Sequence, residues 1–435
     1  MTKNVLVVES PAKAKTINRY LGNDFTVLAS YGHVRDLVPK DGAVDTEHDF
    51  AMHYEVVSRN AKHIKAIADA LSQADTLYLA TDPDREGEAI SWHILELLKK
   101  RRQLGGKKVA RVVFNEITQS AIKAAIDNAR DISMDLVNAQ QARRALDFLV
   151  GFNLSPLLWR KVRPGLSAGR VQSPALRLIC QREAEIEAFV SQEYWTIEAQ
   201  LASDNTQFES KLIELNSKKL KQFDIDNEGD SSRIVSALKT AANGSMTVKS
   251  VEKKERKRHP SPPFITSTLQ QEAARKLGFG ATRTMRLAQQ LYEGVKVGRE
   301  TEGLITYMRT DSVSLSNSAI TQFRHFIEDE YGKDFLPEKP KRYKTKSKNA
   351  QEAHEAIRPT MTQYPPKALK GKIDNDLWRL YDLVWKRAIA SQMLHATLDT
   401  VAIQFDCGGA GIFKSTGSTI KHPGFIILYT EGRDD

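Results

Sequence analysis

The chain has 435 residues, of which 41% are hydrophobic and 27% are charged, and its formal net charge is +10. The length exceeds what one hydrophobic core supports, so several domains are expected. The positive charge indicates an acidic partner, for which nucleic acid is the first candidate and an anionic membrane surface is the alternative. No apolar run is long enough to span a bilayer, and the apolar stretch at the N-terminus is too short for a signal peptide. The only two cysteines, Cys180 and Cys407, lie far apart, which excludes a cysteine zinc ribbon in this chain. Together these features predict a cytoplasmic protein.

The first part of the chain alternates strand-like and helix-like segments. Residues 4–8 form an apolar run suited to a buried parallel strand. Ser10 and Pro11 then begin a helix that Gly22 ends. The predicted strand–helix pairs are 4–8 with 11–21, 76–80 with 88–100, and 110–114 with a helix from 118. This alternation predicts an α/β domain with a parallel sheet, in which ligands bind at the carboxyl ends of the strands.

The later segments mix helical and strand-like patterns. Helices are predicted over 133–189, with a break at 163–169, and then over 267–277 and 281–292. Strands are predicted over 195–201, 208–215, 246–251, 398–405 and 425–428. Between these elements lie a polar stretch at 224–232, a proline-rich hinge at 260–263 and a lysine-rich loop at 339–348.

Carboxylates follow two of the predicted strands. Asp82, Asp84 and Glu86 occupy alternate positions directly after the strand at 76–80, and Glu9 directly follows the first strand. Closely spaced carboxylates repel one another unless a cation offsets their charge, and Mg²⁺ binds through one or two carboxylates together with water and phosphate oxygens. The alternative is that these side chains only stabilise the N-terminus of the next helix. The D-x-D-x-E spacing beside Glu9 favours a metal site.

Three further side chains indicate phosphate chemistry. Lys13 lies one helical turn beyond Glu9 on the same face, where it could donate a proton or contact a phosphate. The alternative is that Lys13 is an ordinary solvated lysine on the helix surface. Tyr307 and Arg309 are separated by one residue, so in an extended segment they share one face. Tyr307 would then be a nucleophile and Arg309 the group that holds the phosphoryl oxygens. The alternative is a half-buried strand edge with a phenol on the surface.

Seven sequence blocks resemble bacterial DNA topoisomerase I, a member of the type IA topoisomerase family. They occur in the family's order and extend over nearly the whole chain. The blocks are residues 7–15 (VVESPAKAK), 30–37 (SYGHVRDL), 80–88 (ATDPDREGE), 113–118 (VFNEIT), 165–173 (GLSAGRVQS), 305–312 (ITYMRTDS) and 353–360 (AHEAIRPT).

The resemblance implies a mixed α/β and α+β multidomain fold in which a parallel-sheet toprim domain and helical and β-rich arch domains form a ring. The implied domains are a toprim domain at 1–135, interrupted near 36–60, an incomplete helical DNA-groove domain at 136–190, an incomplete β-rich arch domain at 191–260 and 396–435, and a helical domain with the catalytic tyrosine at 261–395. Family members continue well past this length, so the chain is expected to be truncated at its C-terminus.

The resemblance also implies a role for each matching catalytic residue. Tyr307 attacks a phosphodiester of single-stranded DNA and becomes a 5′-phosphotyrosine, and Arg309 holds the scissile phosphate. Glu9 and Lys13 handle proton transfer at the 3′-oxygen, with Lys13 favoured as the donor. His354 lies beside the scissile strand, although by itself it could be an ordinary surface histidine.

Other matching positions are implied to bind metal or DNA. Asp82, Asp84, Glu86 and Glu9 bind Mg²⁺, which is needed above all for religation and turnover. The DNA contacts are His33, Arg143, Arg144, Asp147, Arg170, Gln172 and Asp311. Without the resemblance, the two adjacent arginines would be a solvated helix face.

The leading hypothesis is a monomeric, cytoplasmic, nucleoid-associated isomerase that relaxes negatively supercoiled DNA without ATP. It would cleave one strand, pass DNA through the break and rejoin it, with single-stranded and negatively supercoiled DNA as its partners. The alternative is a catalytically incomplete fragment that binds single-stranded DNA. A third interpretation, a toprim nuclease or primase-like enzyme that uses only the acidic cluster, is opposed by the tyrosine block.

Overall fold

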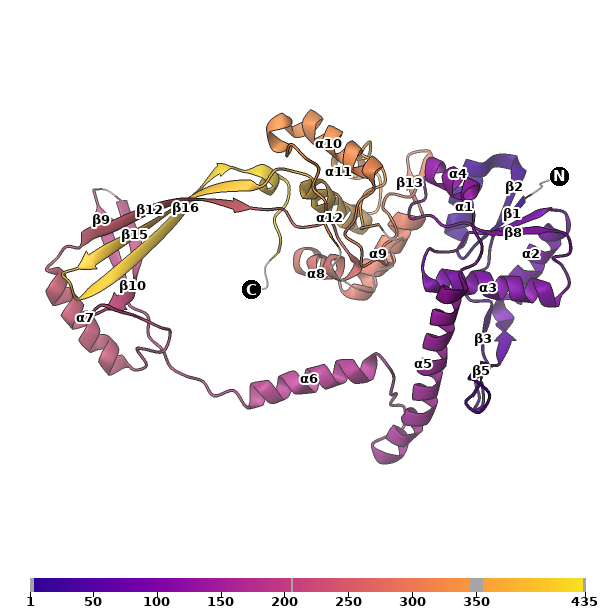
Figure 1. Cartoon of the computed structure of the whole chain (residues 1–435), viewed down its shortest axis with the longest axis horizontal. Helices are drawn as coiled ribbons and strands as arrows, with labels where there is room; N and C mark the ends of the chain where they lie inside the picture. The colour runs from indigo at the N-terminus through magenta and orange to yellow at the C-terminus, as the bar shows by residue number, and fades with distance from the viewer. Residues whose placement is uncertain (1–3, 205, 345–354, 433–435) are drawn as a thin grey trace. The chain divides into compact units, whose positions relative to one another are not determined.

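A computed structural model describes residues 4–204, 206–344 and 355–432. Two compact units can be distinguished in this part of the chain (Figure 1). Unit 1 comprises the residues up to Arg177, Ser261–Gln392 and the residues from Tyr429, and unit 2 comprises Leu178–Pro260 and Met393–Leu428. Within the described ranges, every helix is too short or too polar to cross a lipid bilayer.

The N-terminal part of unit 1 contains a parallel four-stranded sheet, as the sequence predicts (Figure 1). Its strands are β1 (Asn4–Val8), β2 (Phe25–Ala29), β7 (Thr76–Leu79) and β8 (Lys108–Arg111), in the order β2-β1-β7-β8. The helices that alternate with these strands are α1 (Pro11–Leu21), α2 (Ala61–Ser72), α3 (Arg85–Lys100) and α4 (Gln119–Asp127). Because the strands are parallel, the carboxyl ends of β1 and β7 lie at the same edge of the sheet.

Local sequence determines where these elements begin and end. Ser10 Oγ accepts a hydrogen bond from the amide of Lys13 at 3.2 Å at the start of α1, and Gly22 follows its last residue with φ of 66°. α3 begins one turn earlier than predicted, because Asp84 Oδ1 accepts a hydrogen bond from the amide of Gly87 at 2.9 Å. The strand predicted at 110–114 also begins earlier, as β8.

Apolar side chains from the sheet and from α2 and α3 form the core of this region. The buried members include Val5, Val7, Ile64, Ile67, Leu71, Leu77, Leu79, Ile90 and Ile94. Burying one such side chain stabilises the fold by about 1.5–3 kcal/mol. Two short hairpins, β3 (Arg35–Leu37) with β6 (Tyr54–Val56) and β4 (Val44–Asp45) with β5 (Ala51–Met52), are inserted between β2 and α2.

Helices predominate in the rest of unit 1. α5 (Met134–Lys161) and α6 (Gln172–Glu187), which continues into unit 2, flank the break that the sequence predicts at 163–169. After residue 261 come α8 (Thr266–Leu277), α9 (Ala281–Glu293), the hairpin β13 (Val295–Val297) and β14 (Glu300–Glu302), α10 (Asn317–Tyr331), α11 (Pro366–Leu369) and α12 (Asn375–Ser391). The tyrosine segment between β14 and α10 is held by an isolated bridge from Ile305 to Pro359 rather than by a regular strand.

Unit 2 is built on an antiparallel sheet that one helix covers. Its strands are β9 (Glu198–Ser203), β10 (Thr206–Leu215), β11 (Lys218–Lys219), β12 (Thr247–Arg258), β15 (Ala396–Cys407) and β16 (Gly411–His422), and its helix is α7 (Glu228–Ala242). Leu212, Leu238, Phe405 and Phe413 lie in the core between helix and sheet.

This arrangement corrects two predictions. The polar stretch at 224–232 leads into α7, and the strand predicted at 425–428 is wrong, because Gly424–Ile427 forms a 3₁₀ turn.

Candidate active site

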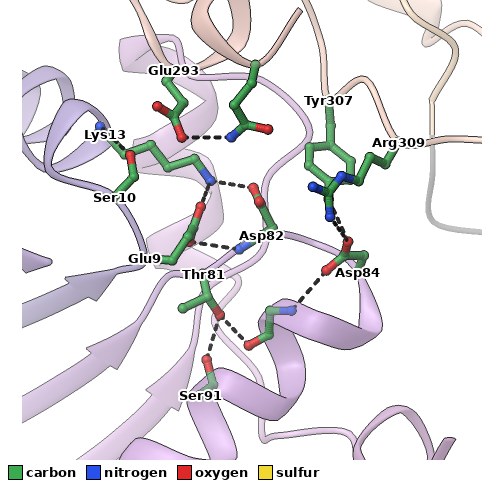
Figure 2. Close-up of polar contacts among 12 residues, drawn as sticks. Glu9, Ser10, Lys13, Thr81, Asp82, Asp84, Ser91, Glu293, Tyr307 and Arg309 are labelled. Atoms are coloured by element: carbon green, nitrogen blue, oxygen red, sulfur yellow. Dashed lines mark hydrogen bonds and ion pairs between the residues drawn. The ribbon is translucent and has the colours of Figure 1, made fainter. Parts of the chain in front are cut away.

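Glu9, Lys13 and Asp82 meet at the edge where β1 and β7 end (Figure 2). Lys13 Nζ forms ion pairs with both carboxylates, and the amide of Asp82 donates a hydrogen bond to Glu9 Oε2 at 3.1 Å. The Lys13 side chain is fully buried. The prediction that Lys13 and Glu9 face one another across one turn is therefore confirmed.

Burial and charge act on these groups in opposite directions. Burial alone would lower the pKa of Lys13, but the negative charges of Asp82 and Glu9 outweigh burial and raise that pKa, so the amine stays protonated at neutral pH. Burial raises the pKa of Asp82 to about 7 despite the opposing charge of Lys13. The lysine is therefore a charged proton donor held between two acceptors.

Tyr307 and Arg309 approach a third carboxylate, that of Asp84 (Figure 2). Tyr307 Oη donates a hydrogen bond to Asp84 Oδ2 at 2.6 Å, and Arg309 Nη1 lies 3.9 Å from the same oxygen. Tyr307 is only 2% exposed, so the alternative of a phenol on the protein surface is wrong. Burial, followed by the charges of Asp82 and Asp84, raises the pKa of the Tyr307 phenol well above its ordinary value, and Arg309 opposes this rise.

The loop that carries Asp84 is fixed from both sides. Asp84 caps α3, and Thr81 Oγ1 donates to the carbonyl of Gly87 at 2.6 Å and lies 2.8 Å from Ser91 Oγ. A Cβ on Gly87 would lie 2.1 Å from the carbonyl oxygen of Asp82, so only glycine fits this position. Asp84 is thus presented to Tyr307 by a loop with little freedom to move.

A cavity of about 1160 Å³ opens beside these residues. Its lining comes from the first two of the three segments of unit 1 and includes Glu9, His33, Asp82, Asp84, Glu86, Arg143, Arg309 and Asp311. Glu86 accepts a hydrogen bond from Gln140 Nε2 at 3.2 Å and lies 3.6 Å from His33 Nε2. The site therefore presents oxygen and cationic groups to one shared space.

The donor chemistry of this cavity fits Mg²⁺. Among the described residues, no three acidic, histidine or cysteine side chains lie close enough to one another to bind a metal ion in their present positions. Asp84 and Glu86 nevertheless supply carboxylates to one cavity wall, and Mg²⁺ commonly needs only one or two carboxylates together with water and phosphate oxygens. Lys13 engages Glu9 and Asp82, which makes these two less available.

Comparison with known proteins identifies the family. A family model described as DNA topoisomerase matches residues 131–435, and one described as Toprim domain matches residues 4–117. The chain belongs to the type IA family of DNA topoisomerases.

Relatives and a solved structure from this family match along nearly the whole chain. DNA topoisomerase 1 of Xylella fastidiosa (strain Temecula1) is 58% identical over 436 aligned positions, covering 100% of this chain and 54% of the relative. DNA topoisomerase 1 of Rickettsia felis is 53% identical and covers 99% of this chain and 56% of the relative. The structure of full-length topoisomerase I from Thermotoga maritima has a TM-score of 0.82 at 36% identity and covers 99% of this chain and 70% of that chain. The chain thus spans about half the length of the curated relatives it matches.

Several of the residues that the sequence predicts to contact DNA lie along α5, just before α6 or at its start. A second cavity, of about 560 Å³, is lined in part by Arg143, Asp147, Trp159, Arg170 and Gln172. Within it, Arg170 Nε donates to Asp147 Oδ1 at 2.8 Å. Arg143 lines both this cavity and the larger one, so the two adjoin.

Arg144, another residue that the sequence predicts to contact DNA, does not line either of these two cavities. Arg144 pairs with Asp36 at 2.7 Å and lines a smaller cavity of about 280 Å³ together with His33 and Glu86. His354 lies outside the described residues, and its place in the site stays a prediction.

Sequence reasoning missed a buried ionic group beside the loop that carries Asp82 and Asp84. Arg111 Nε donates to Glu88 Oε2 at 2.9 Å, and its Nη2 donates to the carbonyl of Asp82 at 2.6 Å. Arg130 Nη1 donates to Glu88 Oε1 at 2.8 Å. The available signal was that Glu88 ends the acidic block and falls on the buried face of α3.

Proposed function

We propose that the chain carries the strand-cleaving chemistry of a type IA topoisomerase, with Tyr307 as the nucleophile. The observation that supports this most directly is the buried phenol, which donates a hydrogen bond at 2.6 Å to Asp84, a residue that lines a large cavity together with other charged side chains. A free phenol has a pKa near 10 and attacks poorly at neutral pH. Its proton therefore needs an acceptor within hydrogen-bond reach, and Asp84 is in that position.

The proposed step exchanges one phosphoester bond for another. The Tyr307 oxygen bonds to the phosphorus of a single strand, and its proton passes to Asp84. The bond from phosphorus to the 3′-oxygen breaks, and Lys13, held by Glu9, protonates the leaving oxygen. A 5′-phosphotyrosine results, and because the number of phosphoester bonds is conserved, rejoining needs no ATP. Arg309 holds the phosphoryl oxygens.

Metal and DNA contacts complete the proposal. Mg²⁺ would be held by Asp84 and Glu86, where it would offset phosphate charge as the strands are rejoined. The single strand would follow the two adjoining cavities, using His33, Arg143, Asp147, Arg170, Gln172 and Asp311, with Arg144 and His354 nearby. The substrate is single-stranded or negatively supercoiled DNA, and the chain acts on it as a cytoplasmic monomer.

The test is relaxation of negatively supercoiled plasmid by the 435-residue chain with Mg²⁺ and no ATP, alongside denaturing-gel detection of a covalent adduct with a labelled single-stranded oligonucleotide. Tyr307→Phe should abolish the adduct, because the nucleophilic oxygen is lost, and leave oligonucleotide affinity within about twofold, because the substitution removes one hydroxyl and leaves the charged side chains of the site in place. Full adduct formation by the Phe variant would refute the assignment.

A second candidate is a fragment that binds single-stranded DNA without completing relaxation. The observation that favours it is that the chain spans about half the length of its curated relatives. It predicts an affinity that falls steeply as salt rises, because binding would depend on phosphate contacts, with no relaxed plasmid in the first assay.

A further inference from the structure

A second tyrosine, Tyr292, lies against both the nucleophile and the proton donor. It belongs to the last turn of α9 and is fully buried. Its ring meets the Tyr307 ring edge to face, with centroids 5.3 Å apart and an interplanar angle of 66°. The ammonium of Lys13 lies over the same ring, 4.8 Å from its centroid. Tyr292 thus contacts two groups that the reaction needs in fixed positions.

The backbone around Tyr292 is held on two sides. Thr16 Oγ1 of α1 donates to the carbonyl of Glu293 at 3.0 Å, and the amide of Leu304 donates to the carbonyl of Leu291 at 2.7 Å. A Cβ on Gly303 would lie 2.7 Å from the carbonyl oxygen of Tyr292, so the segment that leads to Tyr307 passes very close to α9. These contacts join the helix that carries Lys13, the end of α9 and the tyrosine segment.

The ring of Tyr292, rather than its hydroxyl, makes these contacts. The hydroxyl is buried and has no hydrogen-bond partner among the described residues. Burial and then the charges of Asp82 and Glu9 raise the pKa of this phenol well above its ordinary value, so it stays neutral. Unlike the Tyr307 hydroxyl, it has no acceptor among the described residues in position to take its proton. An aromatic face attracts a cation, and an edge-to-face pair restricts the orientation of its partner ring.

We propose that Tyr292 is a positioning residue, whose ring orients the Tyr307 phenol toward Asp84 and keeps the Lys13 ammonium between Glu9 and Asp82. This inference rests on the proposed function, because it concerns the geometry of the same cleavage step. A displacement of about 1 Å at a reacting group can slow a reaction by about 100-fold. The ring therefore contributes to the rate of cleavage while remaining outside the large cavity where DNA would bind.

The experiment compares three substitutions in the full chain. Tyr292→Phe keeps the ring, Tyr292→Met fills similar space without an aromatic face, and Tyr292→Leu leaves part of the space empty. Phe323→Leu is the matched control, because Phe323 is also a buried aromatic residue of unit 1, on α10, away from the site. Each variant is assayed for the single-turnover rate of adduct formation at saturating oligonucleotide, for oligonucleotide affinity and for thermal midpoint.

The Phe variant should cleave within about threefold of the wild-type rate, and the Met and Leu variants about 100-fold more slowly, with oligonucleotide affinity unchanged. Phe323→Leu should lower the thermal midpoint and leave the cleavage rate unchanged. Wild-type cleavage by the Met variant, or a Phe variant as slow as Met, overturns the role of the ring. If the wild-type chain forms no adduct, the proposed function fails; if it forms a Tyr307-dependent adduct that the Tyr292 variants match, only the inference fails.

Discussion

At the scale of single residues, Asp84 combines two contacts that are usually made by separate groups. One carboxylate oxygen caps α3 through the amide of Gly87, and the other accepts the hydrogen bond of Tyr307. Glu86, two residues later, lines the same cavity, where it accepts a hydrogen bond from Gln140 and lies near His33. The proposal gives Asp84 both roles and Glu86 metal binding alone, so substituting Glu86 separates metal binding from proton transfer.

Asp84→Asn and Glu86→Gln should affect different steps. Asparagine still caps a helix but cannot take the phenolic proton, so we expect Asp84→Asn to slow adduct formation by at least about 100-fold. Glu86→Gln should leave adduct formation near the wild-type rate and weaken Mg²⁺-dependent plasmid relaxation. Adduct formation and relaxation are measured over a range of Mg²⁺ concentrations. Equal loss of cleavage in both variants would contradict the division of roles.

At the scale of secondary-structure elements, the buried Glu88 connects three parts of the toprim region. It lies on α3, pairs with Arg111 of β8 and Arg130, and accepts from the amide of Ser133 before α5 at 2.6 Å. Burial alone would raise the pKa of Glu88, but the hydrogen bond from Arg130 and the charge of Arg111 lower it below its ordinary value. The ionised carboxylate is thus the form that the fold stabilises.

Glu88→Gln should lower the free energy of unfolding by about 3–5 kcal/mol at pH 7, because Arg111 would lose its buried partner. Since the folded pKa lies below the unfolded one, the Glu88 contribution is present above the unfolded pKa, near 4.3, and is lost as pH falls below it. The difference between wild type and variant should therefore shrink below pH 4.5, in urea unfolding followed by tryptophan fluorescence. Glu96→Gln, which removes a surface pair with Lys99 on the same helix, should cost under about 1 kcal/mol at either pH.

The local elements could largely be predicted from sequence because their signals are local. Apolar runs and caps located β1, α1 and β7 closely, and the parallel sheet followed from their alternation. The sequence does not predict α7, although Asn227 caps it, because the polar residues at its start are equally typical of a connection between strands. The short apolar run at 425–428 does not distinguish a strand from a turn, and Gly424, with φ of 49°, bends the chain there.

The candidate site could be predicted only in part, because some of its contacts depend on tertiary packing. Consecutive parallel strands imply that Glu9 and the acidic block lie close together, and the structure places Lys13 between Glu9 and Asp82. The hydrogen bond from Tyr307 to Asp84 joins residues 223 positions apart, and no periodicity or spacing encodes it. The burial of Tyr292 against Lys13 is likewise a product of packing.

At the scale of the whole molecule, one buried arginine forms hydrogen bonds near two of the places where the chain passes between the units. The chain returns from unit 2 to unit 1 at residues 260–261 and again at residues 428–429. Arg387 of α12 is 4% exposed, and its Nε donates to the carbonyl of Pro262 at 2.6 Å. Its Nη1 donates to Glu431 Oε1 at 2.6 Å and lies 3.3 Å from Tyr429 Oη. Both connections are thus fastened to the same helix of unit 1.

Arg387→Ala should loosen both connections while leaving the catalytic residues in place. Hydrogen bonds to a charged group contribute about 1.5–3 kcal/mol each, so losing one or two should raise the population of detached connections by at least about tenfold. We expect proteinase K, with products mapped by mass spectrometry, to cut near 260–263 at least about tenfold faster in the variant. We expect oligonucleotide cleavage to persist and, on the proposal that strand passage uses both units, we expect plasmid relaxation to weaken. The control is Lys386→Ala, at the residue next to Arg387, which removes only a surface ion pair with Asp382. Equal proteolysis of the two variants would show that Arg387 does not secure the connections.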